Sequence, residues 1–174
     1  MIFEPKYTIG EIAPAADGSA DTIRQWVKRG IITVGMGRGR IKDKKAELNG
    51  LAHRFTGATA IMIAIMLKLT RLGVSPDLAM QAARAFAHEG DSERDPGHLF
   101  PAGETMLAIS GNRFEVFNAK PSTPLRNAPL YSSNAPMIIL PLDSLVDEMR
   151  KNLRLDPDPR ANTGGKVTGY ANDR

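Results

Sequence analysis

The sequence predicts a mainly α-helical protein, in which four helices are followed by a small α+β module and a disordered tail. Apolar residues recur at helical spacing through residues 1–90, and each run starts at a residue type that caps helices. The composition changes at residues 90–98, GDSERDPGH, and β-capable runs around a turn follow. The last residues are rich in Pro, Gly, Asn and charge, which is typical of disorder. We therefore place a domain at residues 1–90, a small module at residues 99–155 and a tail at residues 156–174.

The first two predicted helices form a helix-turn-helix outline. Thr8 and Glu11 match a T-x-x-E capping box, so the first helix should begin at Thr8. Asp17 and Gly18 are a turn signal, and Ser19 can cap a second helix directly after it. Two short helices joined by a tight turn that contains glycine are typical of this motif.

The second helix has one apolar side and one basic side. At about 100° per residue, Ile23, Trp26 and Val27 gather on one side. The opposite side carries side chains that can donate hydrogen bonds, namely Thr22, Arg24, Gln25, Lys28 and Arg29. Gly30 ends the helix, and two isoleucines return the chain to a core. This pattern suits an anchored helix that contacts a polyanion, although a solvated surface helix has the same pattern.

A basic segment follows the second helix. From Arg24 to Arg54 the chain has nine Lys or Arg residues against two acidic residues, which favours a polyanionic partner. The β-capable pieces at residues 31–34 and 51–55 flank glycines and basic side chains. We therefore expect a basic loop or ribbon that projects from the helices.

Two further helices and the small module complete the predicted elements. Thr56 can cap the most apolar run, and Ser75 precedes a proline at the first position of a fourth helix. The dipeptide GN at residues 111–112 predicts a hairpin turn, and residues 137–142 predict a third strand. Asp143 can cap a closing helix.

The composition argues against several classes of function. The chain has 174 residues, a formal net charge of +4 and no cysteine, which removes disulfides, thiolate metal sites and cysteine nucleophiles. The three histidines lack ligand-like spacing, and GMGRG matches no phosphate-binding loop. The N-terminus has no apolar signal segment, and the most apolar run is too short to span a bilayer. We expect a cytoplasmic protein that is not an enzyme and has no catalytic residue, cofactor, metal or membrane contact.

The segment YTIGEIAPAADGSADTIRQWVKRGII resembles the N-terminal pattern of the MerR-type winged helix-turn-helix family. Members open with an aromatic-T-I-G-E-aliphatic-A run, here residues 7–13, and continue into a T-aliphatic-R-x-aromatic helix that ends in G-aliphatic-aliphatic, here residues 22–32. NGLAHRFTG resembles the end of the family's wing, and RLGVSPDLA resembles the turn between its next two helices. The resemblance covers about residues 5–88 and implies a winged helix-turn-helix domain that binds DNA.

The resemblance implies that the second helix reads bases in the major groove and that the wing contacts the DNA backbone. The residues whose side chains can then reach base edges are Arg24, Gln25, Lys28 and Asp21. Trp26 either packs in the core or donates its indole N–H to a phosphate, and Arg54 takes the position of the wing arginine. The remaining DNA-binding residues are Thr22, Arg29, Arg38, Arg40, Lys42, Lys44 and Lys45.

Nothing after Gly90 predicts the long coiled-coil helix through which members of this family dimerise. We therefore expect a homodimer whose contact, or a contact with another protein, lies within residues 99–155. The predicted function is sequence-specific binding of double-stranded DNA, most simply by a bacterial or phage transcriptional regulator associated with the nucleoid. The alternatives are a DNA-binding accessory factor, such as an excisionase or a terminase-like recognition subunit, and a protein or RNA adaptor that does not read bases.

Overall fold

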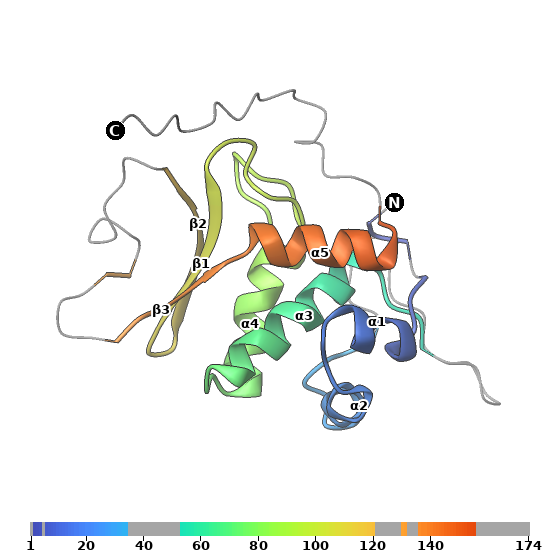
Figure 1. Ribbon diagram of the computed structural model, residues 1–174. Helices are drawn as coiled ribbons and strands as arrows, with labels where there is room; N and C mark the ends of the chain where they lie inside the picture. The colour runs from blue at the N-terminus through green and yellow to red at the C-terminus, as the bar shows by residue number, and fades with distance from the viewer. Residues whose placement is uncertain (1, 5, 35–52, 121–129, 132–135, 156–174) are drawn as a thin grey trace, which may run out of the picture.

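The computed structural model describes residues 2–4, 6–34, 53–120, 130–131 and 136–155 (Figure 1). The described helices and strands are α1 (Ile9–Ala15), α2 (Ala20–Lys28), α3 (Gly57–Arg71), α4 (Pro76–Ala87), β1 (Glu104–Ser110), β2 (Arg113–Ala119), β3 (Ile138–Pro141) and α5 (Asp143–Leu153). The predicted basic ribbon and the predicted disordered tail lie outside the described residues.

The prediction of a mainly α fold is wrong. Of the described residues, 44% are helical and 17% are in β structure, so the protein is a mixed α/β structure. β1 and β2 form the hairpin predicted around residues 111–112, and β3 pairs with the other edge of β1, which gives an antiparallel sheet of order β2-β1-β3. The sheet packs on α4, and α5 then runs back across α3 and α1 (Figure 1). The strands therefore form part of the main core, and the predicted mainly α fold class does not account for them.

The predicted starts of the first four helices are confirmed, and the residues that precede these helices are Thr8, Ser19, Thr56 and Ser75. The Glu11 carboxylate accepts hydrogen bonds of 2.8 Å from the backbone N–H and from the hydroxyl of Thr8. These hydrogen bonds lower the pKa of Glu11, because they favour its ionised form. Thr56 accepts a hydrogen bond of 3.1 Å from the backbone N–H of Thr59 at the start of α3.

Two local predictions fail. Residues 31–34 form no strand, and Phe55 instead pairs with Tyr7 in an isolated antiparallel bridge. Asp143 is the first residue of α5 rather than its cap. Its Oδ2 accepts a hydrogen bond of 2.7 Å from the backbone N–H of Thr105, which ties the start of α5 to β1.

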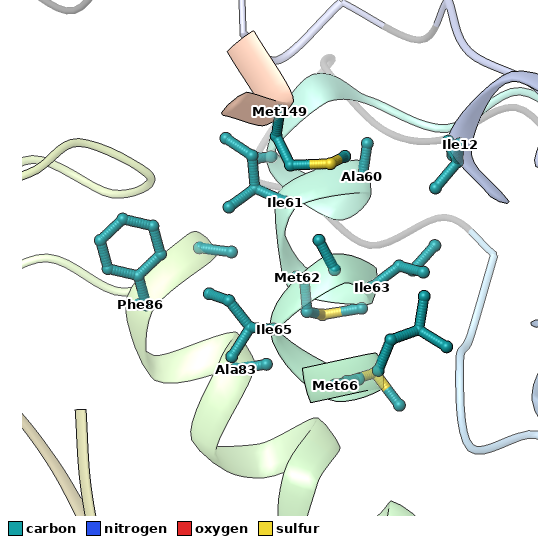
Figure 2. Packing of buried hydrophobic residues seen from close by; sticks show 14 of the residues in the cluster. Ile12, Ala60, Ile61, Met62, Ile63, Ile65, Met66, Ala83, Phe86 and Met149 are labelled. Atoms are coloured by element: carbon teal, nitrogen blue, oxygen red, sulfur yellow. The ribbon is translucent and has the colours of Figure 1, made fainter. Parts of the chain in front are cut away.

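α3 is the centre of the core, since 12 of its 15 residues are buried. Figure 2 shows Ile65 directed toward α4, Ile63 on the side of α1, and Met149 of α5 against the same helix. One hydrophobic cluster joins the helices of residues 1–90 to the sheet and α5, so the predicted boundary at residues 90–98 does not coincide with a break in the core. None of the described helices is both long enough and apolar enough to cross a membrane.

Residues 90–98 are held in place by Arg94, whose side chain is only 2% exposed. Its guanidinium lies 5.0 Å from the centre of the Phe86 ring and donates hydrogen bonds to backbone carbonyls at and beyond the end of α4. Those carbonyls belong to Ala85, Phe86, Glu89, Asp95 and His98, at 2.7 to 3.2 Å. Because the last carbonyls of a helix have no partner within the helix, Arg94 completes the end of α4 and fixes the chain that leads to the sheet.

Candidate nucleic-acid interface

A tight turn at residues 16–19 sets α2 against α1. Asp17 has a left-handed backbone conformation, with φ of 49°, and Arg71 of α3 donates hydrogen bonds to its carboxylate, at 2.9 Å, and to its carbonyl. Gly18 lies so close to the Leu67 side chain that a Cβ at this position would collide with it. The end of α3 therefore fixes the turn and the direction in which α2 leaves it. Sequence reasoning missed the contact of Arg71, because the two partners are 54 residues apart.

The apolar side of α2 anchors it in the core. Ile23 and Trp26 are 0% and 5% exposed, and Val27 is half-buried. Gly30 has φ of 73°, which ends the helix and lets the backbone N–H of Ile31 donate to the Trp26 carbonyl at 2.9 Å. Of the two roles that the sequence left open for Trp26, packing in the core accounts for its burial. The contact of its indole with a phosphate stays a prediction.

The opposite side of α2 is exposed and basic. Arg24, Gln25, Lys28 and Arg29 are exposed, and Thr22 is half-buried. Arg24 Nη1 lies 2.7 Å from Asp21 Oδ1, and the two side chains are 61% and 82% exposed. A pair this exposed is worth about 0.2–1 kcal/mol, so Asp21 holds Arg24 only weakly.

Arg54 lies on a different element from the α2 residues. It is exposed, beside the bridge between Tyr7 and Phe55, and its Nη1 donates a hydrogen bond of 3.0 Å to the Lys6 carbonyl. The other predicted contacts, Arg38, Arg40, Lys42, Lys44 and Lys45, lie outside the described residues. The predicted residues of α2 therefore lie on one side of that helix. Arg54 belongs to another segment, next to the start of α1.

The described part of the chain holds little that suggests another chemistry. It contains no group of three or more His, Asp or Glu side chains arranged to hold a metal ion. His88 follows α4 and packs with its Nε2 3.4 Å from Thr59 Oγ1. Burial, with a smaller effect of Arg84, lowers the pKa of His88 to about 4, so this imidazole is neutral near pH 7.

Neither the protein-family models nor the curated proteins gave a match when compared with the sequence. The resemblance to the MerR-type family therefore rests on the motifs within residues 5–88 and stays a prediction.

Proposed function

We propose that the protein binds double-stranded DNA through α2. The observation that supports this most directly is the division of the helix into two sides. Ile23 and Trp26 are buried in the core, while Arg24, Gln25 and Lys28 are exposed. Guanidinium and amide groups match the acceptor and donor patterns of guanine and adenine in the major groove. In helix-turn-helix proteins, the second helix follows the first after a tight turn and lies in the major groove.

The ion pair within α2 does not oppose this role. An exposed pair like that of Arg24 with Asp21 contributes about 0.2–1 kcal/mol, whereas a bidentate contact with guanine discriminates by about 1–3 kcal/mol. It is therefore favourable for Arg24 to leave the Asp21 carboxylate and bind a guanine edge. Asp21 also weakens contacts with random DNA, because its charge repels phosphates.

We further propose that the protein recognises particular sequences as a bacterial or phage transcriptional regulator. Two alternatives use the same helix: an accessory factor in recombination or DNA packaging, and an adaptor for protein or RNA. Recovery of bound DNA fragments across a genome separates them. Fragments near a few promoters support regulation, and fragments at attachment or packaging sites support the accessory role. An absence of any preference for duplex DNA would require the adaptor role.

Fluorescence anisotropy with the best duplex and with a random duplex tests the role of α2. We expect Arg24→Ala to weaken binding of the best duplex by about 5- to 150-fold, which corresponds to about 1–3 kcal/mol, and to change binding of random DNA little. Arg84→Ala removes the same charge from the exposed surface of α4 and serves as the matched control. Equal effects of the two substitutions on the best duplex would refute base reading by Arg24.

A salt series tests the predicted basic ribbon separately. Each phosphate contact adds about 0.9 to the slope of log affinity against log salt concentration. A variant with Arg40, Lys42, Lys44 and Lys45 changed to alanine should weaken binding to both duplexes. It should also flatten that slope by about one unit for each phosphate that a side chain no longer neutralises. An unchanged slope would remove the ribbon from the interface and leave the proposal for α2 standing.

A further inference from the structure

Side chains from two other helices converge on the turn that precedes α2. This turn, at residues 16–19, follows Ala15, the last residue of α1. Arg71, at the end of α3, donates hydrogen bonds to the carboxylate and to the carbonyl of Asp17. Asn152, near the end of α5, donates a hydrogen bond of 3.1 Å to the carbonyl of Ala15. We call Arg71 and Asn152 the turn clamp.

The turn clamp acts on the backbone of the turn. The last carbonyls of a helix have no partner within the helix, and the Ala15 carbonyl is at the end of α1. Asp17 has φ of 49°, in the left-handed region, which residues other than glycine seldom adopt. The clamp therefore holds this conformation of the turn from α3 and from α5.

The turn clamp contributes little to the stability of the fold. The side chains of Arg71 and Asp17 are 48% and 88% exposed, and Asn152 is exposed as well. Exposed pairs of this kind are weak, because water screens them and competes for them. The place of α2 in the core is maintained by Ile23 and Trp26, which are buried. Loss of the clamp should therefore leave α2 folded but able to lie at more than one angle to α1.

We propose that the turn clamp positions α2 for the reading of bases, so that Arg71 and Asn152 are positioning residues. This inference rests on the proposed binding of DNA through α2. Hydrogen bonds to base edges require aligned donors, whereas attraction to phosphates depends mainly on charge. The affinity for a specific site falls with the fraction of molecules in which α2 is aligned. The clamp therefore acts on specific binding and leaves the binding of random DNA unchanged.

The ratio of the affinities for the best duplex and for a random duplex, measured by fluorescence anisotropy, tests this inference. We expect Arg71→Gln to lower the ratio about 3- to 5-fold, which is close to the most that an exposed ion pair contributes. Addition of Asn152→Ala should lower it at least about tenfold in total. Lys68→Gln is the matched control, because it removes the same charge from the exposed side of α3 one turn earlier. Its ratio should stay within about twofold of the wild type.

Three results would overturn the inference. The first is an equal ratio for Arg71→Gln and Lys68→Gln. The second is weaker binding of both duplexes by Arg71→Gln with a salt slope flattened by about 0.9, because Arg71 would then contact a phosphate directly. The third is a fall in Tm of more than about 4 °C for Arg71→Gln, which would assign Arg71 to the stability of the fold.

Amide hydrogen exchange tests the turn clamp without DNA. The backbone N–H groups of Asp17 and Gly18 donate to the carbonyls of Pro14 and Ala13, at 3.2 and 2.7 Å. Arg71→Gln should speed their exchange at least about threefold and leave the exchange of α4 unchanged, because only the turn is released. Unchanged exchange at the turn would refute the clamp. A wild-type chain that prefers no duplex would refute the proposed function instead, so the two failures are distinguishable.

Discussion

Replacement of Arg94 by methionine should cost more stability than any other change of a single charged side chain in the described structure. Methionine keeps the length of the apolar stem against Phe86 but removes the guanidinium, and with it the donor to five backbone carbonyls. Arg94 Nε lies 3.8 Å from Asp91 Oδ2, too far for a hydrogen bond, so most of the effect comes from the carbonyls. Each buried carbonyl that is left without a donor costs about 1–3 kcal/mol, so the loss of this donor from several carbonyls should cost about 3–5 kcal/mol in total. That is a large part of the roughly 5–15 kcal/mol of a typical domain.

The assay is urea unfolding followed by circular dichroism, with a thermal scan beside it. A destabilisation of this size should lower Tm by about 6–20 °C for a chain of this length. Arg84→Met is the matched control, because Arg84 is 56% exposed and lies 3.6 Å from Glu89. We expect its effect to stay within about 0.5 kcal/mol. A destabilisation below about 1 kcal/mol for Arg94→Met would show that solvent replaces the guanidinium and that Arg94 does not hold the end of α4.

Three further outcomes follow from the described contacts. The lowered pKa of His88 means that the unfolded chain binds a proton between about pH 6.5 and 4 and the folded chain does not, so stability falls as pH falls through that range. The free energy of unfolding should be about 2 kcal/mol lower at pH 5 than at pH 7.5, and His88→Gln should remove most of that difference in urea titrations. Asp21→Asn should strengthen binding to random DNA in anisotropy measurements, because it removes the negative charge beside Arg24; unchanged binding would place α2 away from the duplex. A fragment of residues 1–90 should unfold in urea with lower cooperativity than the whole chain, because it lacks the part of the core that the sheet and α5 supply, and a midpoint and slope equal to those of the whole chain would contradict this.

The sequence predicted those features that depend on neighbouring residues. The caps at Thr8 and Thr56 and the hairpin at residues 111–112 are set by side chains within a few positions of the backbone groups that they serve, and the structure confirms them. The fold class was wrong because it depends on contacts between distant residues. No local pattern shows that the sheet packs on α4 or that α5 returns to α1.

The candidate interface divides in the same way. The helical repeat predicted which residues of α2 are buried and which are exposed, and Ile23 and Arg24 lie as that repeat requires. The contact of Arg71 with Asp17 and the hydrogen bonds of Arg94 were missed, because each joins residues whose proximity only the folded chain creates.

α5 connects the sheet with the helix-turn-helix. At its first residue, Asp143 accepts a hydrogen bond from Thr105 of β1, and near its end Asn152 Nδ2 donates one of 3.1 Å to the carbonyl of Ala15 at the end of α1. The sheet and the helix-turn-helix are therefore joined by one helix that is bonded at both ends, with α3 packed beneath it. The sheet and α2 lie at opposite ends of the molecule (Figure 1). The surface of α2 that we propose to bind DNA is therefore held by contacts that run from the sheet through α5 to α1.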